Sequence, residues 1–204
     1  MAGSLVDLSV AGSSLPSQLV IDSSIVVEWL AATFRSRSVT LPTPTQIGVA
    51  RMVRQMQVER VVGLVTSTSL NEVFHYVLKT SYRLALPNHR DDLLARYPNV
   101  RRHSWEHLFK ARSDLVAQVA ADLDRVRRLM VTANLLVLEP GDLGPIPSGR
   151  TLDDELVRTM ARFALDSNDA AILIEARRAG ISAVASSDPD LRRAQLEFDV
   201  YTWL

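Results

Sequence analysis

The sequence contains no cysteine among its 204 residues. This absence excludes disulfides, zinc sites built on thiolates and catalysis by a cysteine nucleophile. It fits a reducing compartment, and the N-terminus lacks the basic segment and apolar core of a signal peptide, so we expect a cytoplasmic protein. No run approaches the roughly 20 apolar residues that cross a bilayer, so no membrane contact is expected.

An excess of charge of one sign is also lacking, because 23 Lys and Arg residues balance 23 Asp and Glu residues. Zero net charge argues against a dedicated non-specific nucleic-acid binder, which usually carries a basic excess, although a local basic surface is compatible with it. The hydrophobic fraction of 47% is typical of a globular chain rather than a disordered one. The length fits one domain over residues 1–204.

Strand-like and helix-like segments alternate along most of the chain. Strands are expected at 19–22, 61–65, 135–139, 181–187 and 198–204. Helices are expected at 24–32, 45–59, 67–79, 105–132, 152–164, 167–180 and 189–195. This alternation predicts an α/β protein, a three-layer α/β/α fold with a mainly parallel central sheet. An extra N-terminal segment (1–17) and insertions near 31–45 and 83–132, the latter irregular over 85–104, elaborate it.

Four acids fall where a predicted strand meets a predicted helix. Asp22 ends the first strand, Glu72 lies in the first turn after the second, Asp169 opens the helix at "SND", and Asp188 follows "AVASS". In an open parallel sheet, ligands bind beyond the carboxyl ends of the strands. We therefore expect these carboxylates to gather in one pocket.

Each acid also has a structural explanation, which is helix capping. Ser69 and Glu72 match an S-x-x-E capping box, and Asp188 before Pro189 is typical of an N-cap. Asp166 is another N-cap and an alternative to Asp169 as a ligand. Capping is the better explanation for each acid taken singly, but it is compatible with metal binding because a carboxylate has further lone pairs.

Taken together, these segments resemble a PIN domain. "VIDSS" is similar to its opening strand and D-x-S motif, "SLNEV" to its acidic helix, "SNDAAILIEARRAG" to its D-A helix, "ASSDPDL" to its T-x-D-x-D/F turn, and "FDVYTW" to its last strand. The resemblance covers most of the chain in order, although this chain is longer than compact members. It implies a metal-dependent ribonuclease, as in VapC-type toxins, which leaves 5′-phosphate and 3′-hydroxyl ends.

The resemblance also implies roles for individual residues and partners. The metal-binding acids would be Asp22, Glu72, Asp169 and Asp188. Supporting roles fall to Ser24, to Ser186 in place of the family's usual threonine, and to Asp190. A homodimer and a small antitoxin protein that blocks the site are further implications.

Four carboxylates repel one another unless cations neutralise them or some take up protons. Hard divalent cations, Mg²⁺ or Mn²⁺, suit such oxygen ligands. The predicted chemistry is in-line hydrolysis of RNA phosphodiesters by metal-activated water. A catalytically inactive PIN-like scaffold is the alternative within the same fold.

A rival motif lies in the second insertion. His103, Glu106 and His107 fit H-x-x-E-H, the inverted zinc-peptidase pattern, in which both histidines share a helix face. We favour a solvated helix face, because that peptidase family has much longer chains.

Basic and aromatic residues are interleaved in the same segment. Arg101, Arg102 and Lys110 are candidates for RNA phosphate contact, with Trp105 and Phe109 able to stack on bases. We favour the alternative, in which the aromatic side chains pack on the core and the arginines lie in water. The apolar stripe of the 105–132 helix covers the core or forms a dimer surface.

Overall fold

The structure is a computed structural model that describes residues 3–10, 13–34, 41–146 and 149–204. The chain forms two compact units. The sheet unit comprises Met1–Asn71 and Met130–Leu204, and the helical unit comprises Glu72–Leu129. The helical unit overlaps the predicted insertion at 83–132, while the assignment of the whole chain to one domain stays a prediction. Within the described residues, no helix has the length and apolarity to cross a bilayer.

The sheet unit is built on a parallel sheet, which confirms the predicted fold class. Its described strands are β1 (Leu5–Asp7), β2 (Gln18–Ile21), β3 (Val62–Val65), β4 (Leu135–Val137), β5 (Ala183–Ala185) and β6 (Asp199–Thr202). Their order is β1-β6-β5-β2-β3-β4, and every pairing is parallel. The edge strand β1 lies within the predicted extra segment 1–17, where no strand was expected.

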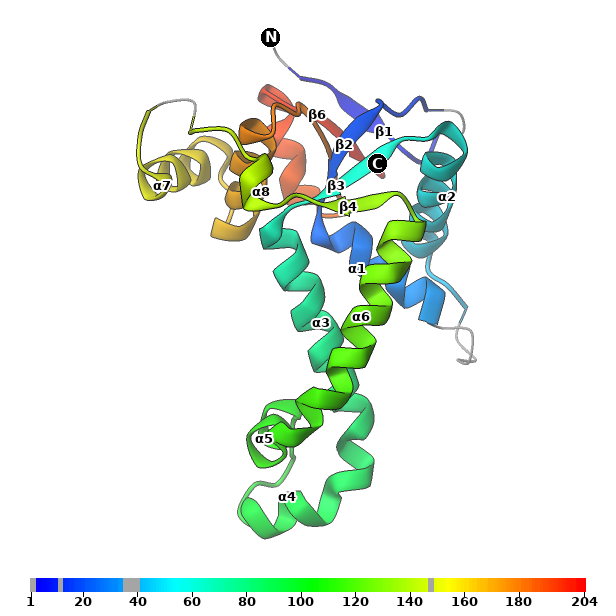
Figure 1. Ribbon diagram of the computed structural model, residues 1–204, viewed down its shortest axis with the longest axis vertical. Helices are drawn as coiled ribbons and strands as arrows, with labels where there is room; N and C mark the ends of the chain where they lie inside the picture. Colours follow the sequence, from blue (N-terminus) through cyan, green and yellow to red (C-terminus); the bar gives the residue numbers. More distant parts are fainter. Residues whose placement is uncertain (1–2, 11–12, 35–40, 147–148) are drawn as a thin grey trace. The chain divides into compact units, whose positions relative to one another are not determined.

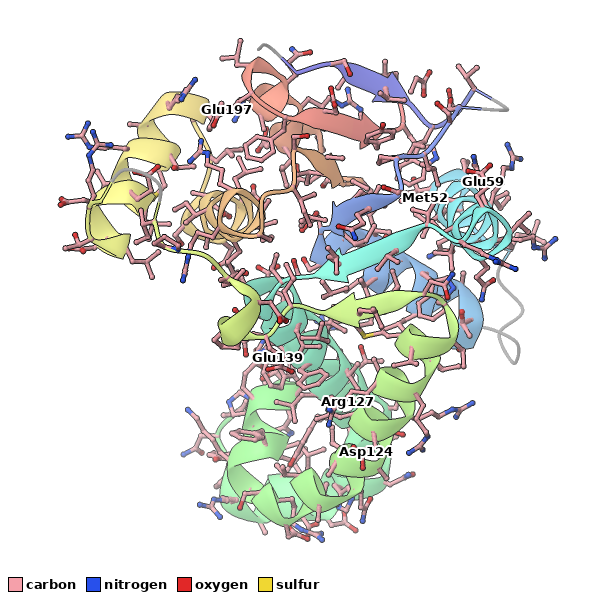
Figure 2. The ribbon with its side chains drawn as sticks, turned by 45° about the horizontal axis from the view of Figure 1, so that its top comes forward. Met52, Glu59, Asp124, Arg127, Glu139 and Glu197 are labelled. Carbon is pink, nitrogen blue, oxygen red and sulfur yellow. The ribbon has the colours of Figure 1, made fainter. Side chains whose placement is uncertain are left out.

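Helices cover the sheet in the order that the sequence predicts. They are α1 (Ser23–Phe34), α2 (Pro44–Glu59), α7 (Leu152–Phe163) and α8 (Ser167–Arg178), with the short 3₁₀ helices η4 (Pro140–Asp142) and η5 (Pro189–Leu196). Helix α1 packs on α2, and α7 packs on α8. Figure 2 shows the α1–α2 pair and the α7–α8 pair on opposite sides of the strands, which makes three layers. The 31–45 insertion falls partly outside the described residues.

Successive side chains along the strands are buried on opposite faces of the sheet. Val20 belongs to the buried cluster formed with α8, together with Val184. The next residue, Ile21, faces the opposite side, because a Cβ built on the neighbouring Gly63 would lie 2.8 Å from Ile21 and 2.6 Å from Met56 of α2. Gly63 therefore makes room for α2 against the sheet. Burial on both faces is why these strands read as continuous apolar runs.

The helical unit contains most of α3 (Ser67–Ala85), then η2 (Leu86–His89), α4 (Arg90–Arg96), α5 (Trp105–Ala111), η3 (Ser113–Leu115) and most of α6 (Val116–Thr132) (Figure 1). The prediction of an irregular segment over 85–104 is wrong in part, because α4 forms there. Asp91 and Asp92 lie in the first turn of α4, where the helix dipole favours acids.

The prediction of one helix over 105–132 is also wrong. Arg112 leaves the helical conformation at φ −133° and ψ 61°, and it separates α5 from η3 and α6. Its guanidinium bonds to Asp114 two residues on, and its carbonyl accepts the hydroxyl of Tyr82. Ser and Asp at 113 and 114 compete with helical hydrogen bonds, which favours this break. The apolar stripe itself is confirmed, because Leu115, Val119, Val126 and Met130 are all buried.

Candidate functional site

Asp22 lies at the point where the chain order in the sheet reverses. From β2 the chain proceeds to β3 and β4 on one side, and it later returns to β5 and β6 on the other. In open α/β sheets the crevice beyond the carboxyl ends at such a switch point is the usual ligand site. The register pairs Ile21 with Ala185 of β5 and with Val65 of β3. Asp22 is therefore flanked by Ser186 and Thr66, the next residues of the neighbouring strands.

The carboxylate of Asp22 is held by serine hydroxyls. Asp22 is only 3% exposed, and its Oδ2 accepts hydrogen bonds from Ser24 Oγ at 2.5 Å and Ser186 Oγ at 2.7 Å. Each hydroxyl also accepts a backbone N–H, Ser24 from Ser187 at 3.1 Å and Ser186 from Asp188 at 2.9 Å. A hydroxyl has a single proton to donate. Both serines therefore direct their protons to one oxygen of Asp22 and fix its orientation.

Asp188 is joined to Asp22 through Ser186, and it also caps a helix. Its Oδ1 accepts the backbone N–H of Asp190 at 2.8 Å, with Pro189 at the start of η5. The predicted capping role is thus confirmed. Asp188 Oδ2 accepts no hydrogen bond from the residues that the structure describes, so this half-buried carboxylate retains an oxygen for a ligand. Asp190 is exposed and pairs with Arg193 at 2.8 Å.

The two acids at the start of α8 have different roles. Asp166 is the N-cap, and its Oδ1 accepts the backbone N–H groups of Asn168 and Asp169, both at 2.9 Å. The cap predicted for Asp166 is therefore confirmed. Asp169 lies in the first turn of α8 and is half-buried. The convergence of Asp169 with Asp22 and Asp188 stays a prediction.

Glu72 lies farther along its helix than expected. Helix α3 begins at Ser67, which places Glu72 at the sixth position, in the second turn and in the helical unit. The buried Thr66 provides the cap instead, because its Oγ1 accepts the backbone N–H of Ser69 at 3.1 Å. The predicted Ser69–Glu72 capping box is therefore wrong, since Ser69 already lies inside the helix.

Helix α3 also receives a carboxylate from another element. Ser67 Oγ donates to Glu175 Oε1 of α8 at 2.6 Å, and the backbone N–H of Thr68 lies 3.5 Å from Oε2. A carboxylate is stabilising at a helix N-terminus. Neither Thr66 nor Glu175 was among the predicted site residues. Thr66 was detectable as the polar residue directly after an apolar strand, whereas nothing local marks Glu175.

Within the described part of the chain, no group of three or more Asp, Glu or His side chains has the geometry to hold a metal ion. The residues that are directly linked are Asp22, Ser24, Ser186 and Asp188. The arrangement therefore provides two linked carboxylates at a switch point rather than a closed cage of four. Their oxygens are hard donors of the kind that Mg²⁺ and Mn²⁺ prefer.

The zinc-peptidase motif does not form the helical pair that it predicts. Ser104 is the N-cap of α5, so His103 precedes the helix and shares no helix face with His107. His107 Nδ1 accepts the backbone N–H of Ser104 at 3.1 Å, and His103 Nε2 lies 3.2 Å from the carbonyl of Tyr97. The Ser104 hydroxyl holds the pKa of Glu106 below its usual range. These histidines stabilise the loop and the start of α5.

The aromatic residues of the basic segment contact other rings within the helical unit. Edge-on ring contacts join Trp105 to His75 and Tyr97 to His107, with centroid separations of 5.5 and 5.1 Å. Phe109 contacts Tyr82 in the same way at 5.5 Å. Arg101, Arg102 and Lys110 are exposed. The segment therefore matches the favoured alternative, in which the aromatic side chains are packed and the basic side chains lie in water.

Comparisons with known proteins do not assign a family. No family model matches the chain, and no curated protein matches it. Among solved structures, the chain is similar to the crystal structure of PAE2754 from Pyrobaculum aerophilum, with a TM-score of 0.42 and 14% identity over 90% of this chain and 83% of that one. We draw no conclusion from a match at this level, and the PIN resemblance stays a prediction.

Proposed function

We propose that the protein is a Mg²⁺- or Mn²⁺-dependent ribonuclease whose centre is Asp22. The observation that carries this proposal is the buried Asp22 carboxylate at the sheet switch point, oriented by Ser24 and Ser186 and joined through Ser186 to Asp188. Burial of a charged carboxylate costs free energy unless hydrogen bonds and a cation compensate for it. A metal-binding role would explain why Asp22 is buried. The resemblance of the surrounding motifs to a PIN domain supplies the reaction and the substrate class.

The donor set fits a hard divalent cation. Asp22 and Asp188 would hold the ion, and Asp169 would be a further acid of the site within the sheet unit. Mg²⁺ is often bound by only one or two carboxylates, with waters and substrate phosphates as its other ligands. The lack of a three-carboxylate group in the described residues is compatible with such a site. When bound, such an ion activates water and stabilises negative charge on phosphate oxygens.

The side chains of the site have separable roles in this proposal. Ser24 and Ser186 keep Asp22 in one orientation, so a ligand does not have to order this carboxylate on binding. Asp188 contributes a carboxylate oxygen from the neighbouring strand–helix junction. Asp190 is a supporting residue, and its own backbone N–H donates a hydrogen bond to Asp188 Oδ1.

The distribution of charge supports RNA as the substrate. The helical unit, residues 72–129, carries eleven Lys and Arg against seven Asp and Glu, a net charge of +4, and the rest of the chain carries twelve against sixteen, −4. The zero net charge of the chain therefore conceals a basic unit. Arg101, Arg102 and Lys110 are exposed there, and arginine forks suit phosphates. Because the neighbouring rings already contact one another, these residues would bind the RNA backbone rather than stack on bases.

The VapC-like resemblance extends the proposal to a homodimer, an antitoxin protein that blocks the site and a cytoplasmic location. Light scattering of the purified chain tests the dimer. Co-expression with a small protein encoded beside it tests the antitoxin, which should form a complex with the chain and suppress cleavage. A monomeric chain would argue against the dimer. A co-expressed protein that neither binds the chain nor suppresses cleavage would indicate an RNA-processing nuclease rather than a toxin.

The nuclease is tested by incubating the chain with a structured and a single-stranded RNA, with Mn²⁺ or Mg²⁺ and then with excess chelator. Cleavage should require the metal and stop with the chelator. Asp188→Asn should lose it, whereas Asp154→Asn, an exposed acid of α7, should retain it. Absence of cleavage by the wild-type chain under all conditions would favour an inactive scaffold.

A further inference from the structure

A cleft of the sheet unit lies apart from the candidate site. Its volume is about 570 Å³, and its charged lining consists of Arg150, Glu155, Arg158, Arg162, Arg177 and Glu197. Asp169 and Arg177 are eight residues apart on α8, which corresponds to about 12 Å along the helix axis. None of the lining residues belongs to the Asp22 site. The volume is within the range of small-molecule sites.

Arg177 forms the inner wall of this cleft. Its guanidinium makes a two-pronged pair with Glu197 at 2.8 and 3.1 Å and contacts Glu155 at 3.2 Å. It also lies over the rings of Phe163 and Phe198, and its side chain is only 15% exposed. Arg177 therefore neutralises much of the charge of both carboxylates in the lining.

The remaining arginines leave the cleft with a positive excess. Four guanidinium groups face two carboxylates, a net charge of +2. Arg150 has one contact of 3.5 Å with Glu155, and Arg162 has one of 2.9 Å with Glu197. Arg158 forms no ion pair or hydrogen bond with any residue in the described ranges. Each guanidinium has five N–H donors, so the outer wall of the cleft retains donors for an anion.

We propose that this cleft binds the diphosphate group of a small anion. Planar guanidinium forks match phosphate oxygens in pairs, which gives both affinity and orientation. Arg158 and Arg162 are four residues apart on α7, so their Cβ atoms are about 5–6 Å apart. The two guanidinium forks lie on one face of the helix, so each can take one phosphate of a diphosphate. The site is independent of the proposed nuclease function.

Calorimetric titration of the full chain with inorganic pyrophosphate tests the site. Chelator in the buffer removes divalent ions, so binding through the Asp22 site is excluded. The wild-type chain and Asp22→Asn should bind one pyrophosphate with the same Kd. The paired change Arg158→Gln with Arg162→Gln should weaken binding by about tenfold or more. Arg158→Lys with Arg162→Lys keeps the charge but removes the forks, so an intermediate Kd is expected.

Matched controls locate the binding and identify the recognised group. Arg127→Gln with Arg128→Gln removes the same charge from α6 and should leave the Kd unchanged. ADP should bind as pyrophosphate does, whereas adenosine should not bind. Thermal melting checks that the variants remain folded. No saturable binding, an equal loss in the control variant, or binding of tetraglutamate as tight as that of pyrophosphate would overturn the proposal.

Discussion

Ser186 donates its hydroxyl to Asp22 Oδ2 over 2.7 Å and accepts the backbone N–H of Asp188 over 2.9 Å. One buried side chain thus links the two acids of the candidate site, which are 166 residues apart in the sequence. The parallel register of β2 and β5 creates this relationship, because Ile21 and Ala185 are paired and the next residue of each strand faces its neighbour.

Replacement of Ser186 by alanine tests this link. In Ser186→Ala, a buried carboxylate loses one donor and the N–H of Asp188 loses its acceptor, so the free energy of unfolding should fall by about 1–3 kcal/mol. RNA cleavage should fall as well, because Asp22 loses its fixed orientation. Urea denaturation measures the stability. The control is Ser182→Ala, an exposed serine just before β5. Equal stability and activity of the two variants would show that Ser186 does not position Asp22.

The ion pairs of Arg112 predict how the stability of the helical unit responds to acid. His89 and the Arg112 guanidinium hold the pKa of Asp92 below its ordinary value of 3.8, and Arg112 does the same for Asp114. A lowered native pKa means that the stabilisation is complete above 3.8 and is lost as the pH falls through the native value. Arg112 stays protonated throughout, because these carboxylates raise its pKa.

Thermal melting between about pH 5 and about pH 2 measures this contribution. Arg112→Gln should lower the melting temperature at the upper end of this range, and its difference from the wild type should shrink as the pH falls. Arg90→Gln changes an exposed arginine of α4 and serves as the control. A difference that stays constant across the range would rule out the carboxylate pairs as its cause.

Because the helical unit is basic, we expect it to bind RNA in a salt-dependent manner and without base preference. Each phosphate contact to a single strand contributes about 0.7 to the slope of log K against log salt, so Arg101→Gln with Arg102→Gln should reduce the slope by roughly 1.4. Fluorescence anisotropy in chelator measures binding without cleavage. Arg51→Gln with Arg54→Gln, on α2 of the sheet unit, should leave the slope unchanged. Oligo-U and oligo-C of equal length should bind alike; a strong preference would indicate base contacts instead.

Much of the sheet unit could be predicted from sequence, because its central strands are buried on both faces and its helices have local signals. Asp166 and Asp188 were recognisable as caps from their positions alone. The edge strand β1 was not, since the pairing of Leu5 with Val200 joins opposite ends of the chain. Such long-range pairing leaves no local pattern.

The errors in the helical unit and at α3 come from competition between local signals. The apolar stripe over 105–132 continues through a break at Arg112, so hydrophobic spacing alone could not detect it. At α3, Thr66 and Ser69 are both good caps, and the earlier residue prevails because β3 ends at Val65. The contact of Ser24 with Asp22 is local, but that of Ser186 depends on the register of β2 and β5, which the sequence does not contain.

The most direct test of the central claim is the single-turnover rate of RNA cleavage by Asp22→Asn in Mn²⁺. Loss of an outer partner of a metal ligand costs roughly 10–100-fold, so loss of the ligand itself should slow cleavage by more than about a hundredfold. Melting should show that the variant remains folded, and Asp154→Asn should cleave at the wild-type rate. Cleavage by folded Asp22→Asn at the wild-type rate would contradict a catalytic centre at this aspartate.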